Sequence, residues 1–245
     1  MTRSGPLLLL SLAWSYAQAD ALTDLTAKLK TLEAPTPVRG TLDASYDEFD
    51  AKGVVDKTKS ARFRLEVDGS EGLQMQLSPE LVQTLSVEET ANAADPEKPT
   101  PNMDLLREMN PLRIQHLLSA APTLLRDLDG ATGPVTKPAT LAGASTELSV
   151  SIPFRAPKKD SDSAKDWQDT LAISLDAQGV PLQFQDKIHG KFCKFFLCVT
   201  VDETYSDTLR VIGGRLVVTA MTLEHQQTGL GQDAHTKTTA TLQLQ

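Results

Sequence analysis

The sequence predicts an α+β protein in which one large, curved antiparallel sheet forms an unclosed half-barrel with helices packed on its concave face. Three observations predict it. About ten segments alternate apolar and polar residues, as strands that bury one face do. Short turns join most of them, and short turns force neighbouring strands to run antiparallel. Only one helical region, Asn110–Leu128, is long enough to cover the apolar face.

The first nineteen residues have the layout of a cleavable secretory signal peptide. Arg3 supplies a positive charge, Pro6–Ala13 is a short apolar core, and Ala17–Ala19 is an A-x-A cleavage site. The apolar core is too short to span a bilayer. A buried N-terminal helix is the alternative. We expect residues 20–245 to form one soluble domain in the periplasm or outside the cell.

One helix and three strands are predicted next. Leucines at three- and four-residue steps predict an amphipathic helix over 21–33. A strand over 38–49 follows. The segments 61–67 and 73–77 alternate apolar and polar residues around the turn Asp68–Ser70, which predicts a hairpin with one buried face.

Helices are predicted in the middle of the chain. Ser78, followed by proline, is a typical N-cap, and the helix it opens runs to about Ala91. The polar, proline-containing segment 92–101 predicts a flexible loop. A second helical region over 103–128 restarts at an Asn-Pro pair and carries the longest apolar stripe in the chain, with a kink expected at Pro122.

The remainder of the chain is predicted to be strands. A loop at 130–140 and a solvated connector at 156–166 interrupt them, and His189-Gly190 is expected to turn the chain. Gly213-Gly214 is a strong two-residue hairpin signal. The expected strands cover 148–154, 171–175, 182–188, 192–201, 209–211, 215–225 and 234–244.

The two cysteines, Cys193 and Cys198, pose a conflict. In an oxidising compartment two cysteines usually pair. Their segment, 192–199, is however predicted to be one strand, in which residues five apart lie about 16 Å apart. A disulfide tolerates at most about 7 Å between Cα atoms. Pairing requires a turn at 194–197, where no turn-forming residue occurs. The sequence leaves the disulfide open.

Composition argues against several functions. The formal net charge is −8, which does not support nucleic acid or an anionic membrane as the main partner. Aromatic residues make up 5% of the chain, too few for an aromatic sugar- or base-binding platform. The sequence has no G-x-S-x-G, H-E-x-x-H or phosphate-binding glycine loop. We therefore expect neither an enzyme nor a cofactor.

The histidines offer one weak alternative, a metal-dependent hydrolase. His225 and His235 flank the last predicted turn, where a cross-strand pair would supply two metal ligands. Two exposed histidines beside a turn explain the pattern more simply, so we predict no metal site. His116, at the edge of the apolar stripe, is expected to be a partly buried packing residue, and His189 to occupy a turn.

A curved sheet under an apolar helix predicts either a filled core or an apolar cavity that the helix partly covers. If a cavity exists, the loop at 92–101 is a candidate flap. The residues expected to line it alternate on the inward face of the strands or follow the helical stripe. They are Phe63, Leu65, Leu73, Met75, Leu117, Leu118, Leu124, Leu125, Phe154, Ile173 and Phe184.

The order of elements resembles that of the periplasmic carriers that sort outer-membrane lipoproteins in Gram-negative bacteria. The segments Ala61–Leu77 and Leu171–Ile188 carry this resemblance best. It implies an unclosed barrel whose helical lid covers a cavity for acyl chains. Because Asp20 rather than cysteine follows the expected cleavage site, the resemblance is to the carriers and not to their lipid-anchored receptors. The expected ligand is a lipid, an acyl chain or another apolar molecule; the alternative is a non-catalytic interaction module with a filled core.

Overall fold

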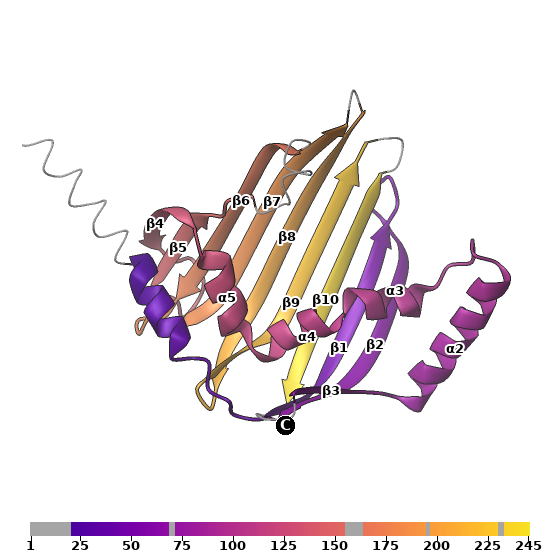
Figure 1. The fold of residues 1–245 in the computed structure, drawn as a ribbon, viewed down its shortest axis with the longest axis horizontal. Coiled ribbons are helices and arrows are strands. Elements are labelled where there is room, and N and C mark those ends of the chain that lie inside the picture. Colours follow the sequence, from indigo (N-terminus) through magenta and orange to yellow (C-terminus); the bar gives the residue numbers. More distant parts are fainter. Residues whose placement is uncertain (1–20, 69–71, 155–163, 195–196, 230–232) are drawn as a thin grey trace, which may run out of the picture.

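The computed structural model describes residues 21–68, 72–154, 164–194, 197–229 and 233–245, and the expected signal peptide lies outside them. These residues form one ten-stranded antiparallel sheet with helices packed against it, as the sequence predicts (Figure 1). The strands are β1 (Val38–Phe49), β2 (Val55–Asp68), β3 (Gly72–Leu77), β4 (Thr132–Pro138), β5 (Thr146–Ser151), β6 (Ala164–Leu175), β7 (Pro181–Lys194), β8 (Leu197–Ile212), β9 (Arg215–Thr228) and β10 (Ala234–Leu244). The helices are α1 (residues 21–30), α2 (Pro79–Ala94), α3 (Pro101–Glu108), α4 (Pro111–Leu118) and α5 (Ala120–Leu128).

The strand order explains why helices lie across the sheet. The order is β3-β2-β1-β10-β9-β8-β7-β6-β5-β4. Because β3 and β4 are consecutive strands that form opposite edges, the chain between them must cross the whole sheet. Helices α2 to α5 make that crossing (Figure 1). Helix α2 packs on α3 beside the β3 edge, α3 lies over β1 and β2, and α4 and α5 pack on β9.

Apolar residues fill the space between the helices and the sheet. Leu42 on β1 lies opposite Phe63 on β2 and Leu242 on β10, and all three are buried. Burying each such side chain contributes roughly 1.5–3 kcal/mol. The helices supply the other side of this core through Leu105, Met109, Ile114, Leu117, Leu118 and Leu124, which are almost completely buried.

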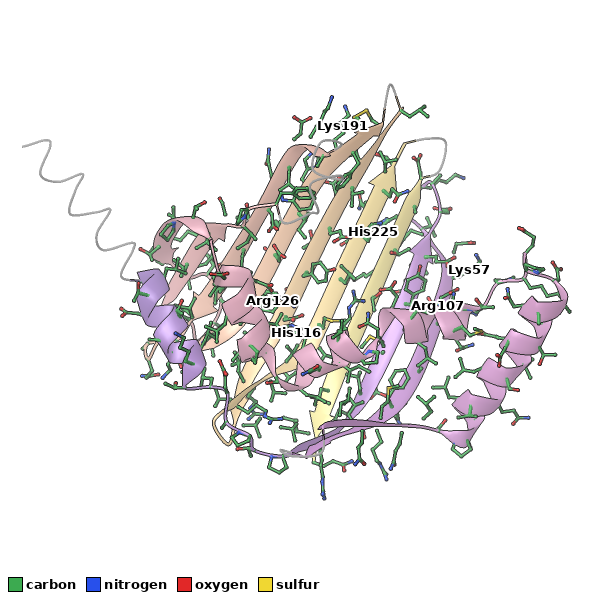
Figure 2. The ribbon with its side chains drawn as sticks, viewed as in Figure 1. Lys57, Arg107, His116, Arg126, Lys191 and His225 are labelled. Atoms are coloured by element: carbon green, nitrogen blue, oxygen red, sulfur yellow. A yellow bond between two sulfur atoms is a disulfide. The ribbon has the colours of Figure 1, made fainter. Side chains whose placement is uncertain are left out.

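The strands extend beyond the layer of helices. Figure 2 shows His116 and Arg126 within that layer, whereas His225 and Lys191 lie further along the strands, where none of the described helices covers the sheet. Among the described residues, the concave face therefore has a part covered by helices and a part without them. None of the helices that the structure describes is long and apolar enough to cross a membrane.

The segment before β1 is fastened to the β8–β9 hairpin. The backbone N–H of Ala34 donates to the carbonyl of Gly214, and that of Leu216 donates to Leu32. The guanidinium of Arg215 donates to the carbonyl of Ala34. The predicted Gly213-Gly214 turn thus has a second role, because it provides the point at which the N-terminal segment attaches.

The long helical region breaks at a different residue from the one expected. The sequence predicts one helix kinked at Pro122, but α4 ends at Leu118 and α5 begins at Ala120. Ser119 between them is extended, with φ −157° and ψ 81°. Pro122 has no N–H to donate to the carbonyl of Leu118, so a continuous helix would lose that bond and clash there. The chain avoids both by restarting, which places Pro122 in the first turn of α5.

Two expected loops are partly ordered elements. The loop predicted at 130–140 contains the edge strand β4, where prolines are tolerated because one side of the strand has no partner. The loop predicted at 92–101 is shorter, since α2 continues to Ala94 and α3 begins at Pro101. Part of the connector predicted at 156–166 lies outside the described residues, and its last three residues, Ala164–Asp166, belong to β6.

The cysteine segment is a hairpin, so the prediction of one strand over 192–201 was wrong. Strand β7 continues through His189-Gly190, where a turn was expected, and β8 returns from Leu197. Cys193 lies opposite Cys198, with 4.1 Å between their Cα atoms, and a disulfide joins them. The pairing of β7 with β8 sets which residues lie opposite each other here, and no turn-forming residue in the sequence marks where β7 ends.

Candidate functional site

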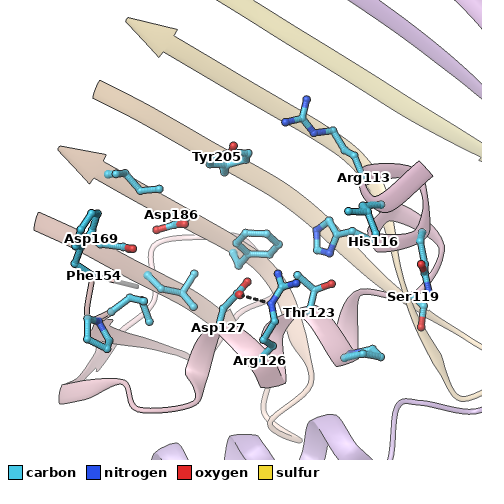
Figure 3. Close-up of a pocket in the computed structure, with 18 of the residues that line it drawn as sticks. Arg113, His116, Ser119, Thr123, Arg126, Asp127, Phe154, Asp169, Asp186 and Tyr205 are labelled. Carbon is cyan, nitrogen blue, oxygen red and sulfur yellow. Dashed lines mark hydrogen bonds and ion pairs between the residues drawn. The ribbon is translucent and has the colours of Figure 1, made fainter. Parts of the chain in front are cut away.

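A cavity of about 830 Å³ lies between α4–α5 and strands β5 to β8 (Figure 3). This volume lies within the roughly 300–1,000 Å³ typical of small-molecule sites. The restart at Ser119 turns α5 away from α4, and both helices contribute to the wall. The lining contains both apolar and ionisable side chains. Among them are His116, Phe154, Trp167, Asp169, Phe184, Asp186 and Tyr205.

Two carboxyl groups lie on the sheet side of this cavity. Asp169 on β6 and Asp186 on β7 occupy inward positions of neighbouring strands, and both line the cavity (Figure 3). Burial, the charge of Asp169 and a hydrogen bond with Asp169 raise the pKa of Asp186 to about 8. Near neutral pH the pair therefore holds one proton and one negative charge, because two close carboxylates do not both ionise readily.

Tyr205 on β8 lies directly opposite Asp186 and also lines the cavity. Burial is the main reason that its pKa is raised to about 12, and the nearby Glu203 adds to the effect. The phenol therefore keeps its proton at every physiological pH and can donate a hydrogen bond to a ligand.

The helix side is attached to the sheet by a buried polar pair. Nε2 of His116 on α4 lies 2.7 Å from Oδ2 of Asp207 on β8, whose side chain is 2% exposed. Burial raises the pKa of Asp207, and the hydrogen bond with His116 acts in the opposite direction. The His116 ring also meets Phe184 edge to face, with 5.7 Å between ring centroids. His116 is thus partly buried, as expected, but it holds α4 to the sheet through a specific partner.

Three aromatic rings gather beside the carboxyl pair. The centroid of Trp167 lies 4.5 Å from that of Phe154 and 6.0 Å from that of Phe192. Gly190 on β7 makes this arrangement possible, because a Cβ there would lie 2.7 Å from Cε3 of Trp167. The indole therefore lies directly against the backbone of β7.

The structure divides the eleven residues that the sequence predicts around a cavity. Phe154 and Phe184 line the cavity described above. The largest group instead fills the core between helices and sheet, and consists of Phe63, Leu65, Leu117, Leu118, Leu124 and Ile173. Leu73 and Leu125 are partly buried against that core, and Met75 on the edge strand β3 is 36% exposed.

The acidic residues of the cavity were not anticipated, although the sequence carries a signal for them. Phe184, Asp186 and Ile188 occupy alternate positions of β7, so the carboxyl falls in the apolar, inward-facing series. Asp169 stands in the same relation to Leu171 and Ile173 on β6. An acid in register with a buried face requires an explanation, because a charge there is costly unless it is compensated.

The other histidines do not form the metal pair considered above. His225 pairs in register with Thr236, and His235 with Gln226, so the two imidazoles lie on opposite faces of the sheet. Each binds its own carboxylate: His225 lies 2.8 Å from Glu203, and His235 lies 2.7 Å from Glu224.

His189 lies within β7 rather than in the turn expected for it, and its Nδ1 lies 2.6 Å from Asp202. Across the described residues, no three His, Cys, Asp or Glu side chains converge on a point that could hold a metal ion.

No protein-family model, curated protein or solved structure matches this chain.

Proposed function

We propose that this protein is an exported, non-catalytic carrier that binds an amphiphilic molecule, such as a lipid or another molecule with an acyl chain, in the cavity between α4–α5 and β5–β8. The observation that carries the proposal is the composition of the cavity wall. Phe154, Trp167 and Phe184 offer apolar surface, while Asp186 and Tyr205 offer hydrogen-bonding groups in the same space. The hydrogen-bonding groups of Asp186 and Tyr205 would have no role in a purely apolar core.

The residues of the cavity wall indicate how the binding of such a ligand would be stabilised. Burying its apolar chain would contribute about 25 cal/mol per Å² removed from water. The polar groups would fix its orientation, as a few placed polar groups do in most small-molecule sites. Among the lipids, acyl chains and other apolar molecules that the sequence leads us to expect, these polar groups favour a ligand with a polar head group.

Two features support export as part of this proposal. Residues 1–19 have the pattern of a signal peptide. The disulfide between Cys193 and Cys198 is typical of proteins that work in an oxidising compartment. In such an aqueous compartment, a molecule with an acyl chain needs a carrier to remain dispersed.

Tryptophan fluorescence tests the binding proposal. The chain has two tryptophans, Trp14 in the expected signal peptide and Trp167 in the cavity wall. In a full-length Trp14→Phe variant, emission reports on the cavity alone. Titration with single-chain amphiphiles below their micellar concentrations is expected to produce a saturable blue shift at one ligand per chain.

Native mass spectrometry of the protein purified from its own cell envelope gives an independent measurement, with bound amphiphile as the expected result. A protein that carries no lipid there, and whose Trp167 emission responds to no amphiphile, would disprove the carrier and favour a module with a filled core.

A further inference from the structure

The cavity has one end that differs chemically from the rest. Asp169 and Trp167 on β6, Asp186 on β7 and Phe154 just after β5 all line it there, and Phe192 backs the indole. Figure 3 shows Phe154, Asp169 and Asp186 together on the sheet side, whereas Arg113 and His116 project from α4 on the other side. We call this group the acidic–aromatic end.

The electrostatics of this end favour a positively charged ligand. The pair holds one negative charge and one proton near neutral pH, and Oδ1 of Asp186 is buried without a hydrogen-bond partner. Aromatic faces attract cations through the negative potential above the ring. An anionic head group at the same place would be repelled by the carboxylate.

The basic groups of the cavity are already neutralised by acids of their own. Arg113 lies 2.7 Å from Glu108, and Arg126 lies 3.2 Å from Asp127. The helix side therefore offers less free positive charge to an anionic ligand than its arginines suggest.

A metal ion fits this end less well than an organic cation does. Mg²⁺ and Ca²⁺ take six or more oxygen ligands, and no third acidic or imidazole ligand joins the pair among the described residues. Aromatic rings would contribute nothing to such a shell. Rings next to a carboxylate are, in contrast, the surroundings that recognise alkylated ammonium groups.

We infer that the acidic–aromatic end binds the ammonium head of a cationic single-chain amphiphile, with the carboxyl pair as counter-ion and the Trp167 ring against the head group. This inference rests on the proposed function, since it names the class of ligand that the same cavity takes.

Binding of a cation should release the proton that the pair of Asp169 and Asp186 holds. A positive charge beside the pair stabilises its doubly ionised form, so the proton leaves when the ligand binds. Affinity for the cation should then rise as the pH rises toward about 8, the pKa of Asp186 in the empty cavity. The ionisable groups that face Asp186 from other elements are Asp169 on β6, Glu203 and Tyr205 on β8, Arg126 and Asp127 on α5, and Arg113 and His116 on α4.

The test uses three probes with the same chain, namely decyltrimethylammonium, decyl sulfate and 1-decanol, each titrated below its micellar concentration into the full-length Trp14→Phe protein. Emission from Trp167 reports binding. The ammonium probe is expected to bind about tenfold more tightly than the alcohol, a preference worth about 1.4 kcal/mol, and the sulfate more weakly than either.

Variants of the pair sharpen the test. Asp186→Asn removes the carboxyl whose pKa is raised to about 8, so the variant should bind the ammonium probe with no increase in affinity between pH 6 and pH 9, where the unmodified pair gains about tenfold or more. Asp169→Asn combined with Asp186→Asn should abolish the preference for the ammonium probe over the alcohol. Asp202→Asn is the matched control, because this strand carboxylate pairs with His189 on the opposite face and should change neither.

The possible outcomes separate the two proposals. Equal affinity for the ammonium probe and the alcohol, tighter binding of the sulfate, or a pH dependence that survives Asp186→Asn would overturn the ammonium site while leaving the carrier intact. If none of the three probes changes Trp167 emission, the ammonium site fails, and if the protein purified from its own cell envelope also carries no lipid, the carrier fails with it. Should the double variant not fold, the pH dependence of the single variant still decides the question.

Discussion

The two halves of the concave face have the same alternation of residues along their strands but differ in packing, because one half is a filled core and the other contains a cavity. Over β1, β2, β9 and β10 the inward positions hold residues such as Leu42, Phe63 and Met221, which are buried where α3, α4 and α5 pack on the sheet. Over β6 to β8 the same alternation places Asp169, Asp186 and Tyr205 inward, and a cavity remains. A leucine laid over these carboxyl groups would remove water from them at a cost of several kcal/mol, whereas α4 and α5 pack on β9, whose inward residues there are apolar.

Asp207 shows the condition under which the covered half accepts an acid. It lies on the same face of β8 as Tyr205, yet it is almost fully buried because His116 binds it. Whether a helix packs closely on a given part of this sheet therefore depends on whether it supplies a hydrogen-bond partner for the acid beneath it.

The largest expected effect is in the filled half. Leu118, the last residue of α4, is fully buried, and Leu118→Ala should cost about 3–4 kcal/mol, because it removes buried surface and leaves a void. Ile188→Ala, on the cavity wall, should cost less than about 1.5 kcal/mol, since water or ligand already reaches that side chain. Urea unfolding of both variants measures the contrast. Equal costs would mean that the two halves are packed alike.

The next largest effect is expected at the buried pair of His116 and Asp207. His116→Ala leaves Asp207 covered and without its partner, and should lower the free energy of unfolding by about 3 kcal/mol. Replacing both residues by leucine removes the unpaired acid and should recover most of that loss. A double variant as unstable as the single one would show that the pair does not hold α4 down.

The carboxyl pair should make stability depend on pH. The pKa of Asp186 is about 8 in the folded protein and near its ordinary value of 3.8 when unfolded, so between these values the folded state binds more protons. Its contribution is present in acid and is lost as the pH rises from about 4 to about 8. Asp186→Asn, which resembles the protonated acid, should therefore stabilise the protein at pH 9 by about 2 kcal/mol and have little effect at pH 4.

Melting temperatures at the two pH values give this measurement, with Asp202→Asn as the exposed control on the opposite face. A stabilisation of the same size at both pH values would show that Asp186 is not protonated in the folded protein.

The smallest effect concerns the aromatic wall. Gly190→Ala places a methyl group against the indole of Trp167 and should cost about 1 kcal/mol while shifting the ring toward solvent. In the Trp14→Phe background this should appear as a red shift of the emission. Lys191→Ala, at the next position and on the other face, should leave the spectrum unchanged.

Local signals in the sequence were enough for most of the elements. Ser78 caps α2 and accepts a hydrogen bond from the backbone of Leu81, and Asn110 caps α4 in the same way through Arg113. Gly213-Gly214 forms the β8–β9 turn, with positive φ at both residues. These features depend on residues within a few positions of one another, which is why a sequence pattern predicts them.

The tertiary structure alone decided which residues of different strands meet. Pairing of β1 with β10 brings the two ends of the domain together and leaves β3 and β4 as the edges. Pairing of β7 with β8 places Cys193 opposite Cys198 in a segment without a turn-forming residue. The register of β6 and β7 brings Asp169 close to Asp186, and only that proximity raises the pKa of Asp186 and makes the cavity a site. Alternation along one strand shows which face a residue takes, but not which residue of another strand it will meet.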